Sequence, residues 1–341
     1  MEFETLIIVF FSLFLYLINF FLKKKKLLID NIKSYEEHKK LLSLNRNTPL
    51  SGGVYFGSII IFLFYSQELF LTITCVFFIL LGMFSDLKLI TSPKLRLVFQ
   101  LLIIFFFISL TPDITIDTRI NWLNSIMQNS FLKPFMISFF FLVLINGFNF
   151  IDGVNNLSSL NFLIILIFIY LLLADNDSLL LKNEILILIL CMSVFTLFNS
   201  FGKNFMGDGA IYGVSFLIGY VLVKISSFNY SISPYFIANL LWYPAFENLF
   251  TIMRRLFKKK KNYLPDNSHL HQKLFKFLNK KKVIKKKYLL STFVGISINL
   301  FLSILYIVGY IYNEKTDVQI CLIFIGILIY LSVFLRLKKL S

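Results

Sequence analysis

Long apolar stretches that recur along the whole chain constrain its fold more than any other feature of the sequence. A helix needs about 20 apolar residues to cross the hydrocarbon core of a bilayer, and many of these stretches approach that length. Hydrophobic residues make up 57% of the 341 residues and charged residues only 15%, whereas a soluble domain averages about 25% charged residues. The sequence therefore excludes an ordinary soluble globule and predicts an all-α, polytopic membrane protein.

We expect eleven transmembrane helices within one integral membrane domain, residues 1–341. The second apolar stretch is short, so it is tilted, re-entrant or wrongly bounded. No small-residue cleavage site follows the first stretch, and four lysines at positions 23–26 come after it, which indicates a retained helix and not a signal peptide. The expected spans are residues 5–22, 53–65, 69–84, 95–110, 131–148, 157–174, 185–198, 210–226, 234–253, 288–312 and 318–335.

The distribution of Lys and Arg predicts how these helices are oriented. Positively charged loops stay on the cytoplasmic side of a membrane, so the lysines at positions 23–26 place the segment after the first span inside. With eleven spans, 29 of the 34 Lys and Arg residues then lie inside and 5 lie outside. One span more or fewer would remove this asymmetry, so we expect the N-terminus outside and the C-terminus in the cytoplasm.

Unusual polar clusters lie at the predicted cytoplasmic ends of the spans and not at the span centres. A transporter usually places ionisable groups near the membrane midplane, and the centres of these spans are almost free of them. Any one cluster alone reads as an ordinary turn or as a topology signal. The clusters lie within residues 30–53, 82–100, 146–156, 199–209 and 247–272.

Three carboxylates and two imidazoles fall on this one predicted face. Together they suit a metal-assisted reaction of a diphosphate. Carboxylate oxygens hold Mg²⁺ with few protein ligands, and cations neutralise phosphate oxygens. The two histidines are two positions apart, so in an extended segment both imidazoles would lie on the same side. They could then bind one phosphate or sugar group together. The five residues are Asp86, Asp152, Asp208, His269 and His271.

The formal net charge of +16 raises the question of a nucleic-acid partner. The basic residues cluster beside apolar spans, and this pattern fits membrane orientation better than nucleic-acid binding. We therefore expect residues 254–287 to form a basic cytoplasmic loop that carries the His-x-His motif and contacts anionic lipid headgroups.

The order of the motifs resembles the polyprenyl-phosphate N-acetylhexosamine-1-phosphate transferases, the MraY/WecA-like group of glycosyltransferase family 4. The resemblance covers residues 30 to about 274. The His–Leu–His form with an upstream Arg–Arg pair looks closer to the WecA-like branch for surface polysaccharides than to the peptidoglycan branch. The matching motifs are Pro–x–x–Gly–Gly at 49–53, Gly-x-x-x-Asp at 82–86, Ser–Pro–Lys–Leu–Arg–Leu-x-x-Gln at 92–100, Asn-x-x-Asp–Gly at 149–153, Lys-x-x-Met–Gly–Asp at 203–208, Arg–Arg at 254–255 and Pro–Asp-x-x-His–Leu–His at 265–271.

The resemblance implies a reaction in which a polyprenyl phosphate, typically undecaprenyl phosphate in bacteria, attacks the β-phosphorus of a UDP-amino sugar. UMP leaves, and the product initiates lipid-linked O-antigen or cell-envelope synthesis. The resemblance also implies Mg²⁺, with Mn²⁺ as the alternative metal, and a site on the cytoplasmic face of a bacterial inner membrane. Homodimers occur in the family. Direct in-line displacement is the preferred mechanism, and a covalent Asp intermediate is the alternative.

The resemblance further implies roles for single residues. Asp208 is the first choice as a metal ligand, and Asp152 with Asn149 would hold the metal or the nucleotide. Asp86 would orient or deprotonate the lipid phosphate. The expected catalytic set is Asp86, Asp152, Asp208, His269 and His271, and the expected substrate contacts are Lys94, Asn149, Asn155, Lys203, Arg254 and Arg255.

Four positions depart from the family pattern. Ser85 stands where the family has the first of two Asp residues, Asn155 where an Asp is common, and Gln272 where a third His is common. Tyr35 stands where the family usually has an Arg. Either the remaining carboxylates suffice, or metal binding is weaker, or the donor is a modified sugar, or the chain is an inactive relative.

Two other classes of membrane protein remain as alternatives. A transporter of lipid-linked sugars predicts charged or Gly/Pro-broken positions at mid-span in paired halves, and the sequence shows few. A structural or receptor protein would not need three Asp residues together on one face.

Overall fold

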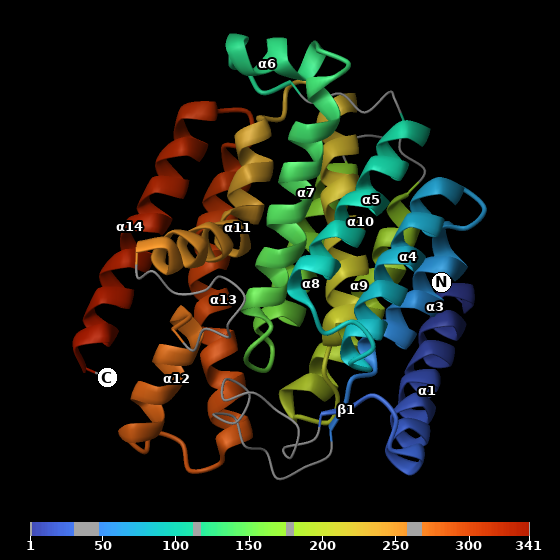
Figure 1. The fold of residues 1–341 in the computed structure, drawn as a ribbon. Coiled ribbons are helices and arrows are strands. Elements are labelled where there is room, and N and C mark those ends of the chain that lie inside the picture. The colour runs from blue at the N-terminus through green and yellow to red at the C-terminus, as the bar shows by residue number, and fades with distance from the viewer. Residues whose placement is uncertain (1, 31–47, 112–116, 175–180, 258–267, 341) are drawn as a thin grey trace.

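The computed structural model describes residues 2–30, 48–111, 117–174, 181–257 and 268–340, and in them the chain is almost entirely helical (Figure 1). The strands β1 (Ile29–Asp30) and β2 (Thr48–Pro49) form a small antiparallel pair. The helices are α1 (Glu2–Lys25), α3 (Gly52–Phe64), α4 (Leu69–Asp86), α5 (Pro93–Leu110), α6 (Asn121–Gln128), α7 (Leu132–Ile151), α8 (Leu157–Ala174), α9 (Lys182–Ser200), α10 (Gly207–Phe228), α11 (Pro234–Phe257), α12 (Leu270–Lys280), α13 (Lys287–Ile311) and α14 (Thr316–Leu340).

Each of the eleven predicted spans coincides with one helix, and α6 and α12 are additional short helices. Eight helices of the described chain are long and apolar enough to cross a membrane. The segments Gly52–Phe64 and Leu157–Leu173 are shorter apolar helices. The prediction of an all-α, polytopic membrane protein is confirmed. Helix α11 has 24 residues but is not among these apolar helices, so the span predicted at residues 234–253 is not a simple apolar crossing.

The connections between helices gather at two opposite ends of the bundle. At one end, the N–H of Phe205 donates to the carbonyl oxygen of Pro49 at 2.9 Å, which joins the segment after α9 to the segment after α1. At the other end, Arg119 donates to the carbonyl oxygens of Tyr230 at 2.9 Å and Glu314 at 3.0 Å. The connections that the lysine distribution assigns to one side therefore share one end, the lower end in Figure 1.

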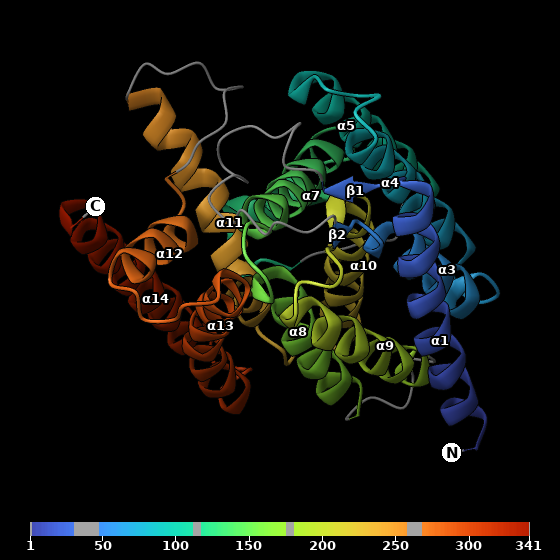
Figure 2. The same ribbon diagram turned by 90° about the horizontal axis from the view of Figure 1, so that it is seen from below.

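Helix α10 lies in the middle of the bundle. Seen from below, α11 to α14 form one flank and α1, α3, α4 and α5 the other, with α7, α8 and α10 between them (Figure 2). The apolar span of α10 is 78% buried inside the protein, as expected for a helix that is apolar on all sides. The start of α10 consequently lies between the two flanks, at the lower end of the bundle.

Glycines allow α4 and α10 to approach each other closely. A Cβ atom at Gly82 would overlap the backbone of Asp208, and a Cβ atom at Gly213 would come within 2.5 Å of the Ile79 side chain. Small residues at helix interfaces permit such backbone contact within membranes. The close approach brings the end of α4 directly beside the start of α10.

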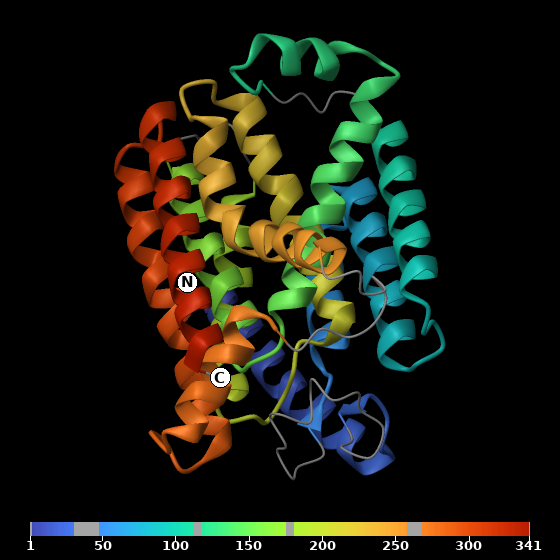
Figure 3. The same cartoon turned by 60° about the vertical axis from the view of Figure 1, so that its left-hand side comes forward.

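Helix α11 bends near its middle, where Pro244 lies inside the helix. Proline has no N–H group and its ring clashes with the preceding turn, so it kinks a helix. The second half of α11 consequently runs across the bundle instead of along it (Figures 1 and 3). This bend explains why α11 differs from the straight apolar spans.

The crossing of α7 and α11 depends on Gly147, and Gly147→Ala is expected to destabilise the protein by about 1–3 kcal/mol. The added Cβ would overlap the Pro244 carbonyl group, and backbone atoms cannot move aside as a side chain can. The midpoint of thermal unfolding in detergent measures this effect. The control is Gly57→Ala, whose nearest contact is Ile79 Cδ1 at 3.6 Å. Equal midpoints for the two variants would contradict a tight crossing.

Candidate active site

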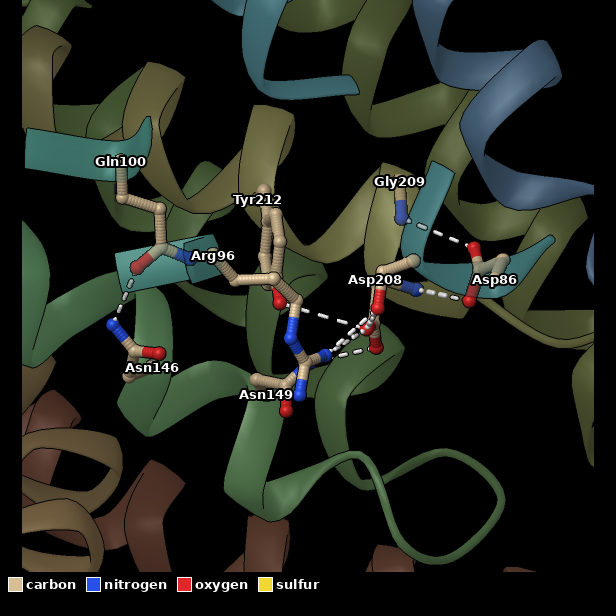
Figure 4. Close-up of polar contacts among 9 residues, drawn as sticks. Asp86, Arg96, Gln100, Asn146, Asn149, Asp208, Gly209 and Tyr212 are labelled. Atoms are coloured by element: carbon tan, nitrogen blue, oxygen red, sulfur yellow. Dashed lines mark hydrogen bonds and ion pairs between the residues drawn. The ribbon is translucent and has the colours of Figure 1, made fainter. Parts of the chain in front are cut away.

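The start of α10 fixes the backbone of Asp208. The preceding Gly207 has φ of +71°, a conformation that glycine adopts without strain. Asp86, the last residue of α4, accepts the N–H groups of Asp208 (3.0 Å, Oδ1) and Gly209 (3.2 Å, Oδ2), as Figure 4 shows. The first N–H groups of a helix lack partners within it and favour a negative charge. Asp86 therefore caps α10 and holds the Asp208 backbone in place.

The Asp208 carboxylate lies at the centre of a polar cluster that four helices supply (Figure 4). Asn149 from α7 donates to Oδ1 at 2.7 Å. Ser85 from α4 and Arg96 from α5 donate to Oδ2 at 2.6 and 2.9 Å, and the hydroxyl group of Tyr212 lies 3.5 Å from the same oxygen. The Asp208 side chain is 22% exposed, so a ligand can still reach the carboxylate.

Arg96 reaches this cluster from the first turn of α5, whose N-cap is Ser92. One turn later, Gln100 accepts a hydrogen bond from Asn146 Nδ2 at 2.8 Å. Residues three or four positions apart share one face of a helix, so Arg96 with Gln100 on α5 faces Asn146 with Asn149 on α7. These polar pairs hold α5 against α7 on either side of Asp208.

The end of α7 connects the Asp208 cluster to the two histidines. Asn149 binds Asp208, whereas the ring of Phe150 lies 5.4 Å from the ring of His269. Gly153 lies directly against His271, because a Cβ atom at this position would overlap Nε2 of the imidazole. The structure thus brings Asp208, His269 and His271 to the same end of the bundle around residues 149–153.

His269 is held by residues from two other helices of its own flank, α11 and α14. Glu247 of α11 lies 2.9 Å from Nδ1 of His269 and accepts a hydrogen bond from the Tyr330 hydroxyl of α14 at 2.6 Å. His269 and His271 stack with ring centroids 5.6 Å apart and an angle of 7° between the rings. The predicted extended segment is wrong: His269 is the N-cap of α12, and His271 lies inside that helix. The rings are nevertheless neighbours.

The other predicted contacts lie around these two clusters. Asp152 accepts a hydrogen bond from Ser158 at the start of α8. Asn155 is buried, and its N–H donates to Ser291 of α13 at 2.9 Å, which ties the loop to that helix. The role predicted for Asp152 in metal binding and that for Asn155 in substrate binding stay predictions.

The predicted basic residues fall into an exposed pair and an anchored pair. Lys94 and Lys203 are exposed, and Lys203 lies over the ring of Phe198 at 5.6 Å. Arg254 donates to the carbonyl oxygen of Ser268 at 2.9 Å. Arg255 lies 5.9 Å from the ring of Phe150, beside the histidines.

The described part of residues 254–287, which the sequence predicts as a basic cytoplasmic loop between two spans, includes the helix α12. Helix α12 packs against α13 and α14. The parts of the predicted clusters at residues 31–47 and 258–267 lie outside the described residues.

Three residues of the site had no predicted role. Ser85 entered the sequence interpretation only as a departure, and Arg96 only as a motif letter. Glu247 was part of a cluster, and an ionisable residue within an apolar span is itself a signal of function. Their importance comes from long-range contacts, which no local sequence pattern specifies.

The Asp208 site fits a magnesium ion whose coordination shell is completed by the substrate. Within the described residues, no group of three or more His, Cys, Asp or Glu side chains is arranged to hold a metal ion. Mg²⁺ usually takes one or two carboxylates and completes its shell with waters and substrate phosphates. The Asp208 carboxylate provides one such ligand. Asn149 Nδ2, Ser85 Oγ and the Arg96 guanidinium already donate hydrogen bonds to its two oxygens and would compete with the metal ion.

Comparison with known proteins agrees with this arrangement. The family model described as glycosyl transferase family 4 matches residues 69–226, which include Asp86, Arg96, Asn149 and Asp208. A phospho-N-acetylmuramoyl-pentapeptide-transferase of Dictyoglomus thermophilum is 27% identical over 240 residues, 67% of this chain and 74% of the relative. The enzyme of the same name from Dictyoglomus turgidum is 27% identical over 259 residues, 71% of this chain and 80% of the relative. These similarities support the MraY/WecA-like group of membrane enzymes, within glycosyl transferase family 4, as the family that this chain resembles.

Proposed function

We propose that the chain transfers a HexNAc-1-phosphate, or the 1-phosphate of a modified amino sugar, from a UDP-sugar to a polyprenyl phosphate and releases UMP. The match to the family model and the similarity to the two transferases support a polyprenyl-phosphate sugar-1-phosphate transferase in general. One observation carries the finer proposal: residues 149–153 contact the Asp208 cluster on one side and the histidine pair on the other.

The charge of the site suits two anionic substrates. A lipid phosphate and a nucleotide diphosphate repel each other, and fixed cations reduce that repulsion. Arg96 lies beside Asp208, and Arg255 lies beside Phe150 next to His269. Cationic groups thus lie on both sides of the end of α7, where the two phosphates would meet.

The proposed reaction is an in-line displacement at phosphorus. An oxygen of the lipid phosphate forms a bond to the β-phosphorus of the donor, and the bond from that phosphorus to the oxygen bridging to the α-phosphate breaks. UMP leaves with this oxygen. Mg²⁺ held by Asp208 and Asn149 would draw charge from the diphosphate. Arg96 would neutralise a phosphoryl oxygen, and the histidines would donate N–H groups to the diphosphate or the sugar.

The membrane surroundings fit the lipid substrate. The apolar spans around the proposed site would let a polyprenyl chain remain in the bilayer while its phosphate reaches Asp208. We place this end of the bundle at the cytoplasmic face of a bacterial inner membrane, because it carries the lysine-rich connections. The His–Leu–His motif with Arg254 and Arg255 favours the WecA-like branch, and hence initiation of O-antigen or other envelope polysaccharides.

A donor panel tests the proposal. Membranes containing the protein are incubated with undecaprenyl phosphate, Mg²⁺ and one UDP-sugar at a time, including UDP-N-acetylglucosamine and UDP-N-acetylmuramoyl-pentapeptide. We expect one donor to release UMP and to yield a lipid-linked sugar diphosphate in equal amounts.

Two controls make this experiment decisive. UMP release should stop when undecaprenyl phosphate is left out, and product should disappear when a chelator removes Mg²⁺. If none of the donors in the panel releases UMP, the transferase proposal is contradicted. Release of UMP without the lipid would indicate hydrolysis instead. Turnover with the muramoyl-pentapeptide donor alone would move the chain to the peptidoglycan branch.

A further inference from the structure

Glu247 is a carboxylate buried in the protein interior, and the proposed chemistry does not use it directly. Its side chain is 0% exposed and lies on α11, less than one turn after the bend at Pro244. A buried carboxylate is costly unless donors from the protein satisfy its oxygens. One oxygen of Glu247 faces Nδ1 of His269 and the other accepts the Tyr330 hydroxyl group. Two separate elements thus supply the donors.

The contact with Glu247 decides which nitrogen of His269 carries a proton. A carboxylate accepts hydrogen bonds and donates none, so Nδ1 of His269 must be the donor at 2.9 Å. The second ring nitrogen, Nε2, is not engaged by Glu247. The partner of one imidazole nitrogen sets the protonation of the other in this way.

The backbone of His269 is held as firmly as its ring. Its N–H donates to Gln272 Oε1 at 3.3 Å, as in a capping box at the start of α12. The preceding carbonyl group, that of Ser268, accepts from Arg254 of α11 at 2.9 Å. Both Glu247 and Arg254 therefore tie the first residues of α12 to the bent half of α11.

The orientation of the His269 ring affects the groups that contact it. Its ring stacks on His271 and lies 5.4 Å from Phe150, one residue after the Asn149 that binds Asp208. A rotation of His269 would therefore disturb both the second imidazole and the end of α7.

We infer that Glu247 is a positioning residue, held by Tyr330, which keeps a proton on Nδ1 of His269 and orients the ring so that Nε2, once protonated, donates to the anionic substrate. The inference rests on the proposed function for the identity of that substrate. The relation between carboxylate and imidazole itself does not depend on it.

The test combines kinetics with ¹⁵N NMR of histidine-labelled full-length protein in detergent. The chain has only 3 histidines, so His269→Gln identifies the signal of His269. In the unchanged protein the neutral His269 should carry its proton on Nδ1. Glu247→Gln should yield a mixture of both forms, because a carboxamide can either accept or donate. Its kcat should fall about 10–100-fold, as for other carboxylate partners of functional histidines, with KM for the UDP-sugar changed less than about threefold.

Glu68→Gln provides a matched control at the opposite end of the bundle. Glu68 is likewise held by a cation, Lys224, and by the hydroxyl group of a tyrosine, Tyr220. This variant should change thermal stability without changing kcat or the His269 signal. Tyr330→Phe keeps the carboxylate but removes its second donor, and it should lower kcat by a smaller factor than Glu247→Gln.

The outcomes separate the inference from the proposed function. Loss of kcat in Glu247→Gln with an unchanged Nδ1–H signal would overturn positioning and indicate a purely structural pair, and so would an unchanged kcat. If Glu247→Gln does not fold, Tyr330→Phe decides: unchanged kcat together with an unchanged signal would overturn the inference. A protein that turns over no donor contradicts the transferase, whereas the NMR signal still reports whether Glu247 fixes the imidazole.

Discussion

Asp208→Asn is expected to lower kcat by about 10³-fold while the protein stays folded. The variant keeps the shape of the side chain but removes the negative charge that Arg96 pairs with and that a magnesium ion would bind. The backbone N–H groups of Asp208 and Gly209 still bond to Asp86, so the start of α10 keeps its cap. Loss of one preorganised electrostatic group of this kind typically costs 10²–10³-fold or more in turnover.

The measurement is UMP release as a function of Mg²⁺ concentration, with thermal unfolding as the test of folding. Asp117→Asn is a control at the other end of the bundle, where Asp117 accepts hydrogen bonds from Arg119 and Asn124. That control should turn over normally. An Asp208→Asn protein with turnover within threefold of the unchanged protein, and with the same Mg²⁺ dependence, would reject Asp208 as the metal ligand.

Gly153→Ala is expected to lower kcat by about 10²-fold through displacement of His271, a loss comparable to that of one transition-state donor. The added methyl group would overlap Nε2 of the imidazole. His271 is 0% exposed, so its ring cannot swing away into solvent. Gly153 is not among the glycines with positive φ, so alanine adds no backbone strain there.

A double-mutant cycle with His271→Ala distinguishes this cause from general damage. If Gly153→Ala acts by displacing the imidazole, the double variant should turn over at the rate of His271→Ala alone, because contacting residues are strongly non-additive. A double variant much slower than either single one would show that Gly153 acts elsewhere. Gly57→Ala, which makes only an ordinary contact, should leave turnover unchanged.

The placement of the helices could be predicted from the sequence because a bilayer makes the requirement local. Each span needs its own run of apolar residues, and each of the predicted runs coincides with a helix. Residues 234–253 also form a helix, but Pro244 and Glu247 interrupt its apolar pattern and the helix bends. Pro244 and Glu247 indicate this irregularity in the sequence itself, because proline kinks helices and buried acids need partners.

The residues whose side chains suit the proposed chemistry were also accessible to sequence reasoning, whereas their partners were not. Asp86, Asp208 and the two histidines stand out by type and by their place at span ends. That Asp86 caps α10, that Arg96 and Ser85 bind Asp208, and that Glu247 holds His269 are contacts across 22 to 123 positions of chain. A pattern within one segment contains no information on such pairs.

The sequence by itself determined that this chain spans a membrane as helices and that its polar chemistry collects at one set of span ends, because hydrophobicity and charge act on each segment separately. Only the tertiary structure decided which polar groups meet. Close approach of α4 to α10 at Gly82, and of the segment after α7 to His271 of α12 at Gly153, joins the carboxylate and imidazole clusters. Such contacts depend on helix packing, which is a property of the assembled bundle.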